Sequence, residues 1–362
     1  MSADRQPATD AQPVSGAQPA TGAQPASGAQ PAGAQRAVDP RPVVVDYLCN
    51  AFFPDRQALW DDAIASTGIN VRVRRGPDEA FCDADTMVAR MDAHGVGTVL
   101  LPTGDLSAHA AVDPRDYDHY AMRWTEYAEL TKRHPGRFAA LLVVDPTRGM
   151  AGVADARARI ADDPTVAGLY LHTHSWDRRF DHADYYPWYA MCADLDVPVA
   201  MQAGTSGGLM ASECGHPIGI DRPALYFPGV RFVLSHTGWP WVDEAVSMAM
   251  KFPNVYLGTG AYPPRHWHAS VHQFLAGPGR RKVMFGTNFP TVAHGKALAQ
   301  IAELDLRAET RERLLGGTAL EVFTRLGRSG PLATGTPEAQ GTPETWDTRD
   351  TPETPDTPGG TS

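Results

Sequence analysis

Short runs of apolar and β-branched residues alternate along the chain with longer stretches of helical periodicity. The runs predict eight strands, near residues 43–48, 97–102, 137–144, 167–172, 197–202, 231–235, 254–258 and 282–286. The longer stretches predict helices at 84–94, 115–134, 147–162, 184–195, 240–251, 266–276 and 294–303, and a closing helical pair at 308–327. Strands that alternate with helices form parallel sheets, so this order predicts an α/β protein with a single (β/α)₈ TIM barrel.

Both ends of the chain lack this pattern. Residues 1–41 repeat six-residue units such as AQPVSG, and residues 329–362 repeat Thr-Pro-Glu and Thr-Pro-Asp steps. Such segments bury too little apolar surface to offset the entropy of ordering, so we predict two disordered tails. The barrel is expected to occupy residues 42–328.

Removing both tails is expected to leave folding and any activity intact. Trp346 is the one bulky aromatic side chain in either tail, so neither has an apolar face that could dock on the barrel. A melting curve of the 42–328 fragment beside that of the full chain checks this. A melting temperature lower by many degrees would contradict it and show that a tail packs on the barrel.

The charge distribution and the cysteines indicate which binding partners and which cellular compartment to expect. The formal net charge is −10, and part of it lies in the C-terminal tail, which contains six carboxylates and a single basic residue, Arg349. The folded part has no basic stripe, which argues against nucleic acid as a partner. Four cysteines are scattered without a CxxC pair, as in reduced proteins: Cys49, Cys82, Cys192 and Cys214. No secretion signal or membrane-length apolar stretch is present, so we expect a cytoplasmic protein that binds a small molecule.

Four segments resemble strand ends of the amidohydrolase-related family, which includes aminocarboxymuconate semialdehyde decarboxylase and the resorcylate decarboxylases. They are VVVDYLCNAFFP (43–54), VPVAMQAG (197–204), VRFVLSHTGWPWVDEA (230–245) and KVMFGTNFPT (282–291). The resemblance implies a barrel whose chemistry lies at the carboxyl ends of the strands. It also implies hydrolysis or decarboxylation of aromatic and cyclic acids with one metal ion.

The positions that match the metal ligands of this family carry other residues here. The family has Asp-x-His-x-His on the first strand, a His at the end of the fifth, and Gly-Ser/Thr-Asp-x-Pro on the eighth. This chain has Leu48 and Asn50, then Gln202, then Asn288, and it retains only the sixth-strand His236. Leucine has no donor atom, and neutral amides are poor ligands for Zn²⁺. We therefore predict no metal and no other cofactor, and a pocket that stays polar.

His172 and His174 form a His-x-His pair at the end of the fourth predicted strand. Strand periodicity places both on one face, toward the barrel mouth. Together with His236 they could form a relocated metal site, or they could contact substrate. The pair has no carboxylate partner and is a weak metal signal, which favours the second interpretation.

The remaining candidates follow from side-chain chemistry. The resemblance implies that His236 is the general acid–base, because the matching histidine of related decarboxylases and hydrolases handles protons, and an unperturbed imidazole pKa near ~6.5 suits proton transfer at neutral pH. Arg178 and Arg179 could pair with a substrate carboxylate or form a solvated loop face. Cys214 follows the fifth strand but has no evident base. The predicted substrate contacts are Asn50, His172, His174, Trp176, Gln202, Trp239 and Asn288.

Two functions of different classes remain open. The first is a metal-independent lyase or hydrolase that acts on a small aromatic or cyclic carboxylic acid through His236. The second is a non-catalytic pseudoenzyme, a binding subunit that pairs with an active homologue. The expected assembly is accordingly a homodimer, or a heteromer with an intact homologue.

Overall fold

The computed structural model describes residues 43–67, 76, 80–105 and 120–327, so both predicted tails lie outside the described residues. Its eight strands form one parallel sheet in the order β1 to β8. Each strand overlaps a predicted one, which confirms the TIM barrel. The strands are β1 (Val44–Asp46), β2 (Val96–Thr103), β3 (Phe138–Val143), β4 (Val166–Leu171), β5 (Val199–Met201), β6 (Phe232–Leu234), β7 (Val255–Gly258) and β8 (Val283–Met284).

The first and last strands are joined by backbone hydrogen bonds just beyond their carboxyl ends. The Tyr47 N–H donates to the Phe285 carbonyl at 3.1 Å, and the Asn288 N–H donates to the Leu48 carbonyl at 2.8 Å. The Asn50 N–H donates to the carbonyl of Phe289 at 3.2 Å. These bonds lay the segment after β8 against the segment after β1, at the end of the barrel where family resemblance places the site.

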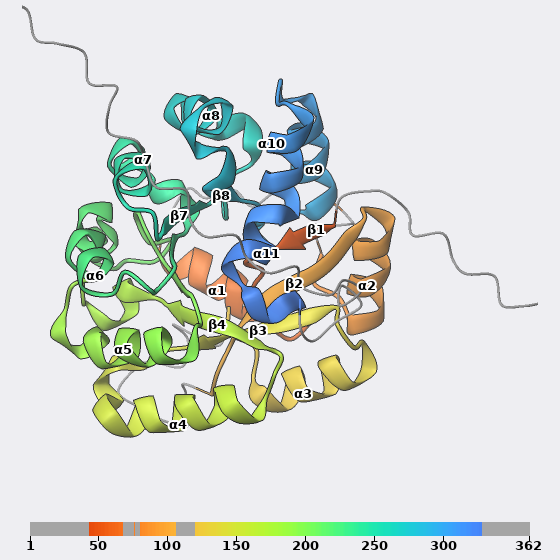
Figure 1. Ribbon diagram of the computed structural model, residues 1–362. Coiled ribbons are helices and arrows are strands. Elements are labelled where there is room, and N and C mark those ends of the chain that lie inside the picture. Colours follow the sequence, from red (N-terminus) through yellow and green to blue (C-terminus); the bar gives the residue numbers. More distant parts are fainter. Residues whose placement is uncertain (1–42, 68–75, 77–79, 106–119, 328–362) are drawn as a thin grey trace, which may run out of the picture. The chain divides into compact units, whose positions relative to one another are not determined.

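Most helices lie where periodicity predicted them, and they surround the strands (Figure 1). They are α2 (Ala84–Ala93), α3 (Trp124–Arg133), α4 (Gly149–Asp162), α5 (Tyr186–Leu195), α7 (Val242–Lys251), α8 (Ala269–Ala276), α9 (His294–Glu303), α10 (Ala308–Glu312) and α11 (Thr318–Val322). Two helices were not predicted, α1 (Arg56–Thr67) and α6 (Asp221–Tyr226). The α1 sequence has no apolar stripe, and α6 is short and contains Pro223, so neither produces a clear helical period.

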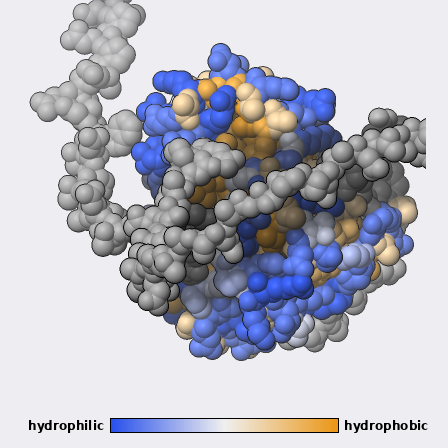
Figure 2. All heavy atoms as spheres, turned by 90° about the vertical axis from the view of Figure 1, so that its right-hand side faces the viewer, coloured by the Kyte–Doolittle hydropathy of each residue, from blue (hydrophilic) through white to orange (hydrophobic). Residues whose placement is uncertain are grey.

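Strand alternation separates two apolar layers. Leu100 of β2 belongs to the cluster inside the barrel, whereas its neighbours Val99 and Leu101 pack in the cluster that includes Met87 and Met91 of α2. Helix α11 contributes its apolar residues to the interior cluster, and in Figure 1 it crosses the middle of the ring of strands. On the face shown in Figure 2, hydrophilic residues surround a smaller hydrophobic area.

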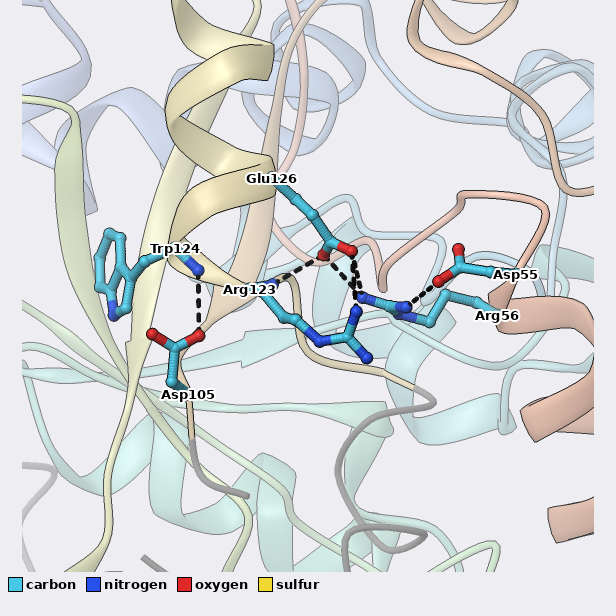
Figure 3. Close-up of polar contacts among 6 residues, drawn as sticks. All are labelled: Asp55, Arg56, Asp105, Arg123, Trp124 and Glu126. Carbon is cyan, nitrogen blue, oxygen red and sulfur yellow. Dashed lines mark hydrogen bonds and ion pairs between the residues drawn. The ribbon is translucent and has the colours of Figure 1, made fainter. Parts of the chain in front are cut away.

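A buried ion pair anchors the start of α1 to α3 (Figure 3). The Arg56 side chain is fully buried, and its Nη2 donates to both carboxylate oxygens of Glu126, at 2.8 and 2.6 Å. Its Nη1 donates to Asp55. Glu126 also accepts from the Arg123 backbone N–H at 3.0 Å, at the beginning of α3. The network therefore holds the loop after β1, which carries Asn50, against a helix far along the chain.

Candidate active site

The predicted site residues gather at the carboxyl ends of the strands. Each follows its strand by one to four residues, and the polar ones are buried except for Asn288, which is partly exposed. In strand order they are Leu48 and Asn50 (β1), His172 and His174 (β4), Gln202 (β5), His236 (β6) and Asn288 (β8). Active sites of TIM barrels lie at this end. That these residues contact a substrate stays a prediction.

Asn50, after β1, and Asn288, after β8, form an amide pair, and Asn288 also bonds to His236, after β6. The Asn50 Nδ2 donates to the Asn288 Oδ1 at 3.0 Å. His236 is also hydrogen-bonded to the Asn288 side chain, and this bond raises the imidazole pKa. A bond that favours the protonated ring is one in which the ring donates, so the Asn288 Oδ1 accepts from both neighbours. The Asn288 amide thus orients His236.

Burial changes the protonation of His236. Desolvation, followed by the nearby charge of His174, lowers the pKa of His236 to about 3, although the Asn288 bond opposes this. The prediction from the sequence assumed an unperturbed imidazole pKa for His236, and the burial of the ring corrects that assumption. At neutral pH the imidazole is uncharged and accepts a proton only when something in the site stabilises the imidazolium.

His174 joins the loops that follow β4, β5 and β6. Its Nε2 lies 2.9 Å from the Gly204 carbonyl oxygen. The Gly204 N–H donates to Gly215, and the Thr205 N–H donates to the Trp239 carbonyl, both at 2.8 Å. A Cβ on Gly215 would lie 2.6 Å from the His174 ring, so glycine is needed at this close approach. Burial lowers the pKa of His174 as well.

His172 does not share a strand face with His174, because β4 ends at Leu171 and a 3-10 helix, η5 (Thr173–Trp176), begins immediately. Their rings nevertheless lie 5.8 Å apart. The His172 Nδ1 is 2.5 Å from the Ser175 Oγ, and its ring stacks on Tyr120 at 5.2 Å. The two histidines therefore line one region by a different geometry from the predicted one.

Two tyrosines of this region were missed. The Tyr170 hydroxyl donates to the Gln202 Oε1 at 2.9 Å, which uses the amide oxygen and leaves the amide N–H groups as the polar end of Gln202. Tyr170 precedes His172 by two residues, so the alternation along β4 was an available signal. Tyr120 offered none, because only the fold brings it against His172.

Left-handed backbone conformations concentrate in the loops after the strands. His236 and Thr237 have φ values of 59° and 54°, Ala261 has 72° and Asn288 has 50°. Residues other than glycine adopt this region at an energetic cost, and such strain is found where side chains are held for function. The two residues joined by the imidazole–amide bond are both among them.

The two aromatic candidates differ in exposure to solvent. Trp176 is buried in the interior cluster, whereas Trp239 is 49% exposed and lies 6.1 Å from the Tyr262 ring. Leu209, in the loop after β5, is 78% exposed. Trp239, Leu209 and Ile218 are bulky apolar side chains that the segments after β5 and β6 leave in contact with solvent.

Arg178, Arg179 and Cys214 each contact an aspartate of the protein. The Arg178 Nε pairs with Asp184 at 2.7 Å, and Arg179 pairs with Asp181 at 3.3 Å. Cys214 donates to Asp177, and burial together with this carboxylate raises the pKa of its thiol to about 12. A thiol with so high a pKa is a poor nucleophile at neutral pH.

The buried carboxylate of Asp46, at the end of β1, was also not predicted from the sequence. Asp46 accepts from the backbone of Leu48 at 3.1 Å, from Thr287 at 3.0 Å through its backbone and 2.5 Å through its hydroxyl, and from the His294 Nε2 at 2.9 Å. It therefore fixes the two segments that carry Asn50 and Asn288. The DYLCN motif marked Asp46, but nothing in the sequence indicated His294.

Tyr47 occupies space that two glycines leave open. A Cβ on Gly258 would lie 2.0 Å from the Tyr47 hydroxyl, and one on Gly286 would lie 2.4 Å from its ring. A side chain at either position would therefore clash with Tyr47 in this arrangement.

The described residues include no group of three His, Cys, Asp or Glu side chains placed to hold a metal ion. His172, His174 and His236 are thus not arranged as such a group, and the absence of a metal ion stays a prediction. Among the same residues, no helix is long and apolar enough to cross a membrane.

Comparison with solved structures agrees with the fold. An uncharacterised TIM-barrel protein from Bordetella bronchiseptica is 22% identical, with 79% of this chain and 99% of that chain covered and a TM-score of 0.62. A 5-carboxyvanillate decarboxylase from Sphingomonas paucimobilis is 18% identical, with 78% and 99% covered and a TM-score of 0.53. A dihydroxybenzoic acid decarboxylase from Polaromonas, solved with manganese and 2-nitroresorcinol, is 17% identical, with 78% and 97% covered and a TM-score of 0.57.

No curated protein matches the sequence. A sequence model described as amidohydrolase matches residues 71–325, which is most of the chain and nearly all of the barrel after β1. With the eight-stranded barrel and the strand-end motifs, this match shows that the chain belongs to the amidohydrolase family.

Proposed function

We propose that the chain is an amidohydrolase-family enzyme that binds a small carboxylic acid at the mouth of its barrel and transfers a proton through His236 without a metal ion. The observation that carries the proposal is the bonded set of Asn50, Asn288 and His236. Amide groups at two positions of the family's ligand set orient the one retained histidine. Structural relatives named as decarboxylases of aromatic acids support a carboxylic acid as the substrate.

The donor set at these strand ends does not fit a divalent ion. Leu48 is fully buried and has no donor atom. The Asn288 Oδ1 accepts from Asn50, and the Gln202 Oε1 accepts from Tyr170, so the amide oxygens already have partners. Zn²⁺ prefers thiolate, imidazole and carboxylate ligands, and Leu48, Asn50, Gln202 and Asn288 offer none of these. We therefore derive no catalytic step through a metal.

The reaction proposed for His236 is decarboxylation with protonation of carbon. An anionic substrate beside the ring favours the imidazolium and raises its pKa toward neutrality. The bond between the ring or chain carbon and the carboxylate then breaks, CO₂ leaves, and its electron pair stays on that carbon. His236 delivers its proton there, and the Asn288 Oδ1 keeps the imidazole aligned throughout.

The alternative is a binding subunit without catalysis. One support is Leu48, which packs inside the barrel at a position that matches a metal-ligating residue of the family. The other is the low pKa of His236 in the free protein. A pocket that binds acids but converts none of them, together with co-purification of an intact homologue, would decide for this alternative.

Protein purified without chelators is expected to carry much less than one metal ion per chain. The reason is the loss of donors at Leu48, Asn50, Gln202 and Asn288. Elemental analysis after dialysis is the measurement, with an intact family decarboxylase purified in parallel as the control. One Zn²⁺, Mn²⁺ or Fe per chain that survives dialysis would contradict the metal-independent proposal.

A further inference from the structure

Two buried imidazole nitrogens in the site have no hydrogen-bond partner within the protein. They are the Nδ1 atoms of His174 and His236. Buried polar atoms are nearly always paired, and leaving one unpaired is costly. Two such atoms on neighbouring loops therefore indicate that something outside the chain completes them.

The contacts of each ring determine which nitrogen carries the proton. The His174 Nε2 faces the Gly204 carbonyl oxygen, which can only accept, so this nitrogen bears the hydrogen. His236 donates to the Asn288 side chain, and because its Nδ1 is unpaired, the donor is Nε2. In the neutral rings both Nδ1 atoms are therefore bare lone pairs, which accept hydrogen bonds and donate none.

The two rings share one environment. A charge on His174 disfavours a charge on His236, so the rings are close enough to interact, and His172 lies 5.8 Å from His174. A carboxylate offers only acceptor oxygens and does not satisfy a lone pair. The Gln202 amide N–H groups can serve the carboxylate, because Tyr170 occupies the Gln202 oxygen. The imidazoles need a different group, an O–H or an N–H.

We propose that His174 and His236 select the ligand by its hydrogen-bond donors, so that the site binds acids that also carry a hydroxyl or amino group directed at the two Nδ1 atoms. The inference rests on the proposed function only in placing an acid at the barrel mouth. It concerns recognition and holds whether or not His236 performs catalysis.

Calorimetric titration of the full chain with three matched probes tests the proposal. The probes are 3-hydroxybenzoate, 3-aminobenzoate and 3-methoxybenzoate, which keep the acid and differ in the donor. The hydroxy and amino probes are expected to bind about tenfold or more tightly than the methoxy probe, because the latter leaves buried acceptors unpaired. Equal affinities, or no binding by any of the three, would overturn the proposal.

Glutamine variants separate the lone pair from the rest of each ring. The amide of His174→Gln or His236→Gln can still donate from the Nε2 position but has no acceptor at Nδ1. The preference for the hydroxy probe is expected to fall to near unity in both. His182→Gln, at a half-exposed histidine outside the site, should keep it. Preference retained in both site variants would contradict the assignment.

A spectroscopic measurement on the wild-type chain is independent of how the variants fold. Nitrogen NMR of the histidine rings should show an unprotonated Nδ1 in both His174 and His236, shifted by the hydroxy probe and not by the methoxy probe. A proton on Nδ1 of either ring would overturn the proposal. Absence of turnover by the wild-type chain with the binding preference intact would count against the proposed catalysis alone, and turnover by the wild-type chain without any preference would count against this inference alone.

Discussion

Replacing His236 by asparagine is expected to lower turnover by about 10²–10⁴-fold while the fold and the binding of the substrate carboxylate remain. This is the usual size of a general acid–base contribution, and the amides Asn50, Gln202 and Asn288 cannot take over the role, because they do not titrate near neutrality. The measurement is CO₂ release from a panel of aromatic and cyclic carboxylic acids, with ligand affinity and melting temperature determined in parallel.

The pH dependence distinguishes a catalytic from a structural role of His236. Burial lowers the pKa of His236 to about 3 in the free protein, so kcat/KM should show no ionisation of this residue between pH 5 and 8. Bound anion raises that pKa, so any ionisation seen in kcat should vanish in His236→Asn. His182→Asn is the control on the surface. Normal turnover by His236→Asn would rule out the catalytic assignment.

Replacing Glu126 by alanine is expected to destabilise the protein by about 3 kcal/mol. Removing one partner of a buried ion pair leaves the other charge without compensation, at a cost of ~3–5 kcal/mol. We expect the lower end, because Asp55 still contacts Arg56 and Glu126 is partly exposed. Denaturant unfolding of the full chain, followed by fluorescence and circular dichroism, is the measurement.

Glu321→Ala is the matched control for this second variant. Glu321 pairs with Arg281 and Arg313, but its side chain is 42% exposed, and such surface pairs contribute about 0–1 kcal/mol. If Glu126→Ala costs no more than Glu321→Ala, then Asp55 alone compensates the buried guanidinium and the link between α1 and α3 is weak. The site gives a further readout, since a loosened loop after β1 should also weaken ligand binding near Asn50.

The linear sequence was sufficient to predict the barrel and to assign the candidate site residues to one end of it. Apolar runs and helical periods each extend over neighbouring residues, so they could be read without any tertiary contact. The order of elements then required a parallel barrel, and the ends of its strands selected Asn50, Gln202, His236 and Asn288. Helices α1 and α6 were not predicted because α1 has no clear apolar face and α6 is short and contains Pro223.

Tertiary structure alone decided the protonation and the partners of these side chains. Asp46 and His294 are 248 positions apart, and Arg56 and Glu126 are 70 apart, so no local pattern could pair them. The pKa of His236 depends on how much water its ring loses and on the proximity of His174, both of which are properties of the folded chain. Residue types and their order along the chain therefore determined where polar chemistry is located. Burial and long-range hydrogen bonding determined which atoms there are free to accept a proton or a ligand.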